Sequence, residues 1–161
     1  MSEHIRRHGP VLGLAGLALT ACALKPPVPE VIERERSYEV GREIAQQRVG
    51  AALQAAGFPP SDPADGQIRA SLTYEDERGW ARCRAPLIKE MGGDRRRPAR
   101  PLDRTANVTA RIEGDDNASQ VIVDANFEAR MLNGFTNREL DVACRSLGSL
   151  EAQVLDAVGR P

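Results

Sequence analysis

The sequence predicts an α+β domain with an N-terminal helix, four to five antiparallel strands and a C-terminal helix, both helices packing on one face of the sheet. Apolar residues recur every three or four positions in residues 37–57 and 146–159, which is typical of amphipathic helices. Between these segments apolar and polar residues alternate, as in strands that bury one face. Such elements are expected to form two layers around one core.

The first helix is predicted to begin at Ser37, because a serine hydroxyl is well suited to cap a helix N-terminus. It should end at Gly57, because Pro59 and Pro60 follow and proline cannot continue a helix. Its buried face would contain Tyr38, Ala45, Val49, Ala52, Leu53 and Ala56.

Two hairpins are predicted from the alternating region. In the first, residues 67–74 would pair with residues 80–87 around a turn at residues 76–79, where acidic residues and a glycine favour a change of direction. Pro86 should mark an edge or an end of the second strand, because it lacks a donor for the sheet.

The second hairpin has the clearest alternation in the chain. Residues 108–112 would pair with residues 121–131 around a turn at residues 114–117. After Asn133 and Gly134, a last short strand is predicted that contains Leu140, Val142 and Cys144.

The final helix is expected to be capped by Ser146 or Ser149 and to end at Gly159. Glu151 would lie near the positive end of its dipole. The buried stripe would consist of Leu147, Leu150, Val154, Leu155 and Val158.

The first 22 residues have the pattern of an export signal. Arg6 and Arg7 precede an apolar run, residues 10–21, that is shorter than the roughly 20 apolar residues a membrane-spanning helix needs. A basic start followed by a short apolar run is the build of a secretory signal peptide.

The run ends in Leu19-Thr20-Ala21-Cys22, which resembles the lipobox of bacterial lipoproteins. The resemblance implies removal of residues 1–21 and attachment of acyl chains such as palmitate to Cys22, with the domain in the periplasm. Several acyl chains make a stable membrane anchor. In this family an aspartate after the cysteine retains the protein in the inner membrane, so Ala23 favours the outer membrane. The alternative is an ordinary signal peptide with a coincidental cysteine.

Residues 22–36 would then be the lipidated N-terminus and a Pro-rich tether, and residues 37–161 would be the domain. Both histidines, His4 and His8, lie in the segment predicted to be removed. A mature chain without histidine excludes Ser-His-Asp and Cys-His catalysis and imidazole metal sites. The sequence therefore predicts no enzyme, no metal site and no cofactor.

Cys83 and Cys144 remain as a pair once Cys22 is lipidated. Each shares the parity of the apolar residues in its predicted strand, so both should point into the core. In an oxidising compartment such a pair is expected to form a disulfide. The alternative is two buried free thiols.

A basic segment lies between Gly93 and the third predicted strand, and we expect it to be a flexible loop. Such a run is either a solvated surface or a binding surface for anionic headgroups, envelope polymers or an acidic partner, since guanidinium groups match phosphate oxygens. No aromatic residues interleave with it, which argues against nucleic acid as a partner. Its arginines are Arg95, Arg96, Arg97, Arg100 and Arg104.

Two aromatic residues are candidates for a protein interface. Trp80 adjoins the first predicted turn on the parity away from Cys83, so it is either an exposed anchor or local packing. Phe135, in the turn after Gly134, is a weaker candidate of the same kind.

These features favour a non-enzymatic envelope lipoprotein that docks on another protein. The alternative is a binder of anionic lipid or envelope polymer through residues 95–104. A cell-wall hydrolase that uses carboxylates is disfavoured by the absent histidines. The residues Cys144, Ser146, Gly148, Leu150 and Glu151 are similar in type and spacing to an ending of small uncharacterised proteobacterial lipoproteins, which is consistent with the envelope.

Overall fold

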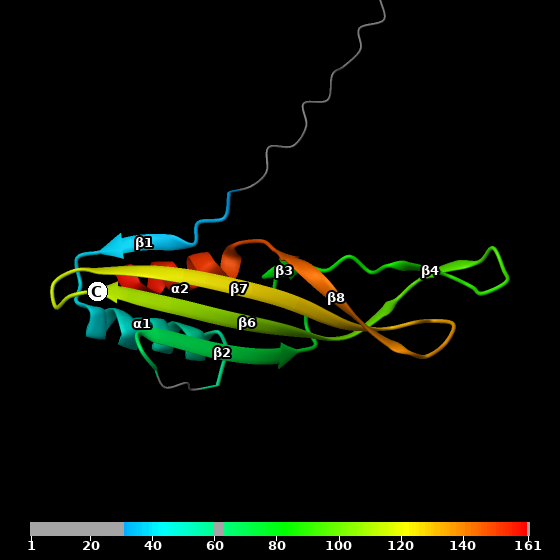
Figure 1. Ribbon diagram of the computed structural model, residues 1–161, viewed down its shortest axis with the longest axis horizontal. Coiled ribbons are helices and arrows are strands. Elements are labelled where there is room, and N and C mark those ends of the chain that lie inside the picture. The colour runs from blue at the N-terminus through cyan, green and yellow to red at the C-terminus, as the bar shows by residue number, and fades with distance from the viewer. Residues whose placement is uncertain (1–30, 60–62, 161) are drawn as a thin grey trace, which may run out of the picture. The chain divides into compact units, whose positions relative to one another are not determined.

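The computed structural model describes residues 31–59 and 63–160 (Figure 1). The predicted signal peptide, Cys22 and the first part of the predicted tether lie outside the described residues. The described residues form two helices and an antiparallel sheet of six strands, which confirms the predicted mixture of helices with an antiparallel sheet. Neither helix is long and apolar enough to cross a membrane.

The sheet is built on one long hairpin, β6 and β7, which runs through the middle of Figure 1. One edge of β7 serves two partners, with β1 pairing near its start and β8 near its end. The main path across the sheet is β2-β6-β7-β8-β3. The strands are β1 (Glu35–Tyr38), β2 (Gln67–Tyr74), β3 (Ala81–Arg82), β6 (Arg100–Gly114), β7 (Ser119–Leu132) and β8 (Glu139–Ser146).

The turn between β6 and β7 depends on two residues. Gly114 has a φ of +127°, and a Cβ there would lie 2.2 Å from the backbone oxygen of Ala118, so only glycine fits. The Asp115 carboxylate accepts hydrogen bonds from the backbone N–H groups of Asn117 and Ala118, at 2.8 and 3.0 Å. This local chemistry fixes the register of the long hairpin.

Helix α1 (Arg42–Ala55) and helix α2 (Ser149–Gly159) cover part of the sheet. They contact each other, and both contact β7. One buried cluster joins their apolar side chains to alternate residues of β2, β6 and β7. It contains Ala45, Val49, Leu53, Ile68, Val108, Ile112, Val121, Val123, Phe127, Leu150, Val154 and Val158 among others.

A second, smaller cluster lies on the same side of the same long strands but beyond the helices. Ala129 and Met131 of β7 are buried there, with Val142 and Leu140 of β8 packed against them. The covering residues come from the segment after β3 and are Cys83, Ala85, Ile88 and Ala99. The chain therefore covers one sheet with helices at one end and with an irregular segment at the other.

That irregular segment contains a small hairpin, β4 (Leu87–Lys89) and β5 (Arg96–Pro98). We call residues 87–98 the arm. Figure 1 shows the arm (green) and the turn between β7 and β8 (orange) projecting together at the end of the sheet away from α1.

The predicted N-terminal order is wrong, because a strand precedes the first helix. Glu35 and Arg36, expected in the tether, belong to β1, and so does Ser37, the expected helix cap. Helix α1 instead starts after Gly41, which makes no side-chain cap. A Cβ at Gly41 would lie 2.3 Å from the backbone oxygen of Asp116, so the close approach to the β6–β7 turn selects the glycine.

The predicted pairing of residues 67–74 with residues 80–87 is also wrong. All eight residues of β2 pair with β6. Strand β6 begins at Arg100 rather than near residue 108, so it is long enough to pair with the whole of β2. Residues 75–80 then carry the chain from β2 to the opposite edge of the sheet. There Ala81 and Arg82 pair with β8.

The basic segment is not a flexible loop. Arg96 and Arg97 lie in β5, and Arg100 and Arg104 lie in β6. The segment is held against the sheet through its neighbours Ile88 and Ala99, which pack into the second cluster.

Candidate functional site

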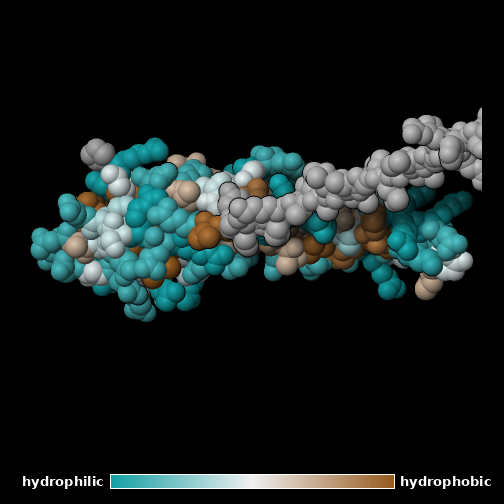
Figure 2. Space-filling view, turned by 90° about the horizontal axis from the view of Figure 1, so that it is seen from above, coloured by the Kyte–Doolittle hydropathy of each residue, from teal (hydrophilic) through white to brown (hydrophobic). Residues whose placement is uncertain are grey.

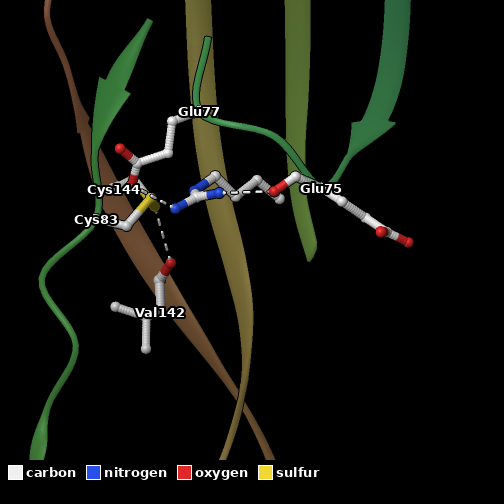
Figure 3. Close-up of a disulfide and its surroundings, with 6 residues drawn as sticks. Glu75, Glu77, Cys83, Val142 and Cys144 are labelled. Carbon is white, nitrogen blue, oxygen red and sulfur yellow. Dashed lines mark hydrogen bonds and ion pairs between the residues drawn. A yellow bond between two sulfur atoms is a disulfide. The ribbon is translucent and has the colours of Figure 1, made fainter. Parts of the chain in front are cut away.

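A disulfide joins Cys83 to Cys144, as predicted. It ties the segment just after β3 to β8, and so fixes the start of the path that leads to the arm. Figure 3 shows the bond lying near Glu77, at the place where the chain crosses the sheet. Both sulfurs pack against the second cluster, which agrees with the predicted inward direction of the two side chains.

The arm has an inner and an outer face, because residues directly opposite each other in a hairpin share a face. Arg97 lies opposite Ile88, which packs on the second cluster. The Arg97 guanidinium lies 5.2 Å from the centroid of the Phe135 ring, a cation–π contact that joins the arm to the β7–β8 turn. The structure thus brings together two residues that the sequence offered separately as site candidates.

The outer face of the arm presents basic and apolar side chains to solvent. Lys89 lies directly opposite Arg96, and Leu87 lies opposite Pro98. Leu87 is 67% exposed and Met91, in the turn of the hairpin, is 97% exposed. In the view of Figure 2, hydrophilic side chains cover most of this end of the molecule.

The charges on the arm are only partly compensated. Lys89 and Arg95 have exposed carboxylate partners, Asp94 at 3.5 Å and Glu90 at 4.0 Å, and such pairs contribute little in water. Arg96 and Arg100 have no ion-pair partner among the described residues. Like charges directly opposite each other on paired strands destabilise the pairing. The Lys89–Arg96 pair therefore does not serve to stabilise the arm.

Arg104 differs from the other arginines of the predicted group. It lies opposite Tyr74 and Ala129, on the covered face of the sheet, and its side chain is only 14% exposed. It donates hydrogen bonds to the backbone oxygen of Glu75 at 3.1 Å and to the Glu77 carboxylate at 3.0 Å. Arg104 therefore holds the crossing segment, residues 75–80, against the sheet.

Trp80 is not an exposed anchor, so the local-packing alternative is the correct one. It is only 7% exposed, and its ring stacks on Phe58 at 5.9 Å and meets Tyr74 edge-on at 5.5 Å. The Arg78 guanidinium covers it at 5.1 Å. Trp80 fills the interior where the chain crosses the sheet. Its place in the alternating pattern of the predicted strand does not indicate this burial.

A cavity of about 300 Å³ opens where the crossing segment reaches β3. We call it the arginine pocket. Arg78, Arg82 and Arg104 line it, together with Glu77 and the rings of Tyr74 and Trp80. Burial raises the pKa of Tyr74, although the charges of Arg104 and Arg78 act in the opposite direction.

Sequence reasoning missed this pocket because its arginines come from a predicted turn, a predicted strand and a predicted loop. Only the crossing of residues 75–80 over the sheet, which the sequence did not predict, brings Arg78 and Arg82 to Arg104. Within the described part of the chain, no group of three or more His, Cys, Asp or Glu residues is placed to hold a metal ion.

Comparisons with protein-family models, with curated proteins and with solved structures found nothing that matches this chain.

Proposed function

We propose that the protein is an envelope lipoprotein, anchored in the outer membrane by acyl chains on Cys22, whose periplasmic domain is a non-enzymatic protein-interaction module. The lipobox-like residues 19–22 support the anchor. The Cys83–Cys144 disulfide is consistent with an oxidising compartment. The outer face of the arm is the observation that carries the interaction.

The arm is built to present side chains rather than to bury them. Its path starts at a disulfide, its inner face packs on the second cluster, and Arg97 joins it to Phe135. A surface that is already ordered loses little conformational entropy on binding. The partner that fits is a protein with acidic groups around a small apolar contact, to receive Arg96 and Met91.

A site-specific cross-linking experiment tests this proposal. A photoreactive residue at position 91, in the full chain in intact cells, should give a cross-linked protein of one defined mass. The same residue at Gln47, an exposed position on α1, is the matched control. Equal products from both positions, or none from position 91, would contradict the proposal.

A second variant separates the charge of the arm and of Arg100, which follows it, from the structure of the arm. Lys89, Arg95, Arg96 and Arg100 are replaced by glutamine, while Arg97 and Arg104 are kept because they make internal contacts. The cross-link from position 91 should then fall several-fold. An unchanged yield would show that the basic residues do not contribute to docking.

The second candidate function is binding of anionic lipid or envelope polymer by the same surface. The like-charged Lys89–Arg96 pair beside exposed Leu87 and Met91 favours it, because basic and apolar side chains together suit a charged membrane interface. A form that starts at residue 31, without the acylated cysteine, should float with vesicles that contain phosphatidylglycerol and not with neutral ones. If instead it floats with neither, this candidate is excluded.

A further inference from the structure

We propose that the arginine pocket binds a phosphate-type oxyanion, either free or as part of a larger molecule. The proposal does not depend on the function of the arm. It rests on a cavity of about 300 Å³ whose lining includes three arginines from three different elements. Guanidinium groups are the side chains best matched to the geometry of phosphate oxygens.

The charges around the pocket are unbalanced. Arg78, Arg82 and Arg104 face a single lining carboxylate, that of Glu77. Cations of like charge that share a confined space repel one another, and a low-dielectric wall strengthens the effect. A second carboxylate, that of Asp76, pairs with Arg78 at 3.3 Å, so one positive charge remains uncompensated and a bound anion would balance it.

Arg104 is the residue best placed to anchor the anion. Its side chain rises from the covered face of β6 and is mostly buried, so its charge is less screened than that of a surface arginine. One of its two partners, the Glu77 carboxylate, is 88% exposed. A largely solvated carboxylate contributes little to stability and exchanges readily for another anion. Glu77 thus occupies the position that a ligand oxygen would take.

The other two arginines have donors left for a ligand. Arg78 uses Nη1 to bond the backbone oxygen of Ala56 at 2.8 Å and Nε to bond Asp76 at 3.3 Å, which leaves Nη2 available. Arg82 is exposed on β3, where its backbone pairs with Arg145. Its guanidinium makes no hydrogen bond or ion pair with the described residues.

The aromatic wall of the pocket provides a direct readout. Trp80 is the only tryptophan in the sequence, and Arg78 covers its ring. A ligand that draws the Arg78 guanidinium away from the ring, or adds charge beside it, changes the emission of that single fluorophore. Binding can therefore be followed in the unlabelled protein.

The experiment is a titration of the full chain, purified in a nonionic detergent, with inorganic phosphate at constant ionic strength. We expect a saturable change in tryptophan emission that chloride does not produce. Arg82→Gln and Arg104→Gln should each weaken binding by about tenfold or more, the size expected for a hydrogen bond to a charged group. Glu77→Gln should tighten it by roughly two- to fivefold, because an exposed competing ion pair is removed.

The matched control is Arg69→Gln. Arg69 lies on the opposite face of β2, where it bonds Gln67, and it should leave the titration unchanged. Arg82→Gln is not expected to disturb folding, because the Arg82 side chain is exposed and makes no hydrogen bond or ion pair with the described residues. A loss of binding in this variant therefore reports on the pocket. The proposal would be overturned if neither inorganic phosphate, glycerol 3-phosphate nor phosphatidic acid vesicles gave a saturable change, or if Arg82→Gln and Arg104→Gln left the change unaltered.

Two further ligands separate the possible sources of the phosphate group. Saturation with glycerol 3-phosphate, but not with inorganic phosphate, would assign the pocket to an esterified phosphate in solution. An emission change only with vesicles that contain phosphatidic acid would assign it to a lipid headgroup. Both outcomes support an oxyanion site, provided that Arg104→Gln abolishes them.

Discussion

Glu151 is an acidic residue that is fully buried in the first turn of α2. Its Oε1 accepts a hydrogen bond from the Ser146 hydroxyl at 2.8 Å, and the same hydroxyl accepts one from the backbone N–H of Gly148 at 3.0 Å. Its Oε2 has no partner among the described residues. The helix dipole favours an acidic residue here, but an unpaired buried oxygen destabilises the fold.

Glu151→Gln is expected to raise the free energy of unfolding by about 1 kcal/mol. The amide retains an oxygen that accepts from Ser146, and an unpaired neutral group is less costly to bury than a charged one. Glu151→Ala should lower the same quantity by about 2 kcal/mol, because it leaves a cavity and an unpaired hydroxyl. Urea unfolding measures both. Equal losses in the two variants would mean that the carboxylate has a charged partner.

We expect Asp115 to make the stability of the long hairpin depend on pH. Hydrogen bonds from the backbone N–H groups of Asn117 and Ala118 lower the pKa of its carboxyl. A group whose pKa is lower in the folded state stabilises the fold above its unfolded pKa, about 3.9, and this contribution is lost as the pH falls through the folded pKa.

Asp115→Asn keeps an acceptor oxygen but cannot titrate. The native chain should therefore be more stable than Asp115→Asn at pH 7, and the difference should vanish once the pH is below the folded pKa of Asp115. Chemical unfolding at a series of pH values measures this. Asp116→Asn is the control, because the Asp116 side chain makes no hydrogen bond with the described residues. A pH-independent difference would exclude titration of Asp115 as the cause.

At the scale of elements, the contact between the arm and the β7–β8 turn depends on Arg97 and Phe135. A double-mutant cycle with Arg97→Ala and Phe135→Leu should give a coupling free energy of about 0.5–1 kcal/mol, as for an exposed cation–π pair. The same cycle with Arg96→Ala should give none, because Arg96 lies on the outer face of the arm. Coupling of equal size in both cycles would contradict the assignment of faces.

The disulfide is expected to stabilise mainly the end of the molecule that carries the arm. It closes a loop with a sequence separation of 61 residues, for which the chain-entropy model gives about 4 kcal/mol. Replacing Cys83 and Cys144 by serine should speed hydrogen exchange in residues 83–99 and in β8 more than in α1. Mass spectrometry of the exchanged protein checks this. A uniform acceleration would show that the two clusters unfold as one unit.

The elements with strong local signals were predictable and their partners were not. The β6–β7 hairpin was predicted because alternation and turn chemistry agree over residues 108–131, and the register of the structure preserves that agreement. The partner of β2 was mispredicted because alternation specifies a buried face but not the neighbouring strand. The chain bends at residues 75–76 and 79–80 without forming the predicted turn, and it leads across the sheet instead of back along it.

The candidate sites also include one feature that was predictable from the sequence and one that was not. The Cys83–Cys144 pair was predictable because the parity of both residues and the predicted oxidising compartment point to it. The two roles of the arginines were not, because Arg104 follows Arg100 by four residues yet lies under the crossing segment while Arg100 is exposed. Burial of a single arginine is decided by which segment covers the sheet, and the sequence contains no local sign of it.

At the scale of the whole molecule, one long hairpin has two covers, and the arginine pocket lies where they meet. Helices α1 and α2 cover the main cluster, and the segment after Cys83 covers the smaller one. The crossing residues 75–80 pass between the covers, so the pocket exists only when both ends are folded. Anion binding is therefore expected to protect both ends from unfolding.

The N-terminal boundary of the domain also follows from this architecture. Strand β1 pairs with β7, the backbone oxygen of Arg34 accepts a bond from the Val123 N–H at 2.7 Å, and the Tyr38 hydroxyl donates to the Leu155 oxygen at 2.6 Å. Arg36 forms ion pairs with Glu33 and Asp156. Residues 31–38 are thus part of the fold. If Cys22 is acylated, the nine peptide units from it to residue 31 reach at most about 30 Å, so the domain must stay close to the membrane.

A form that starts at residue 39 should therefore be less stable than one that starts at residue 31, by about 3 kcal/mol. The loss comes from several backbone hydrogen bonds of about 0.5–1.5 kcal/mol each and from the uncovered edge of β7. Urea unfolding of the two forms measures it, and Arg36→Ala in the longer form shows how much of the loss belongs to the ion pairs alone. Equal stability would place the boundary after β1 and lengthen the tether. If Cys22 is acylated, the longer tether would let the arm bind a partner farther from the lipid surface than a boundary at residue 31 allows.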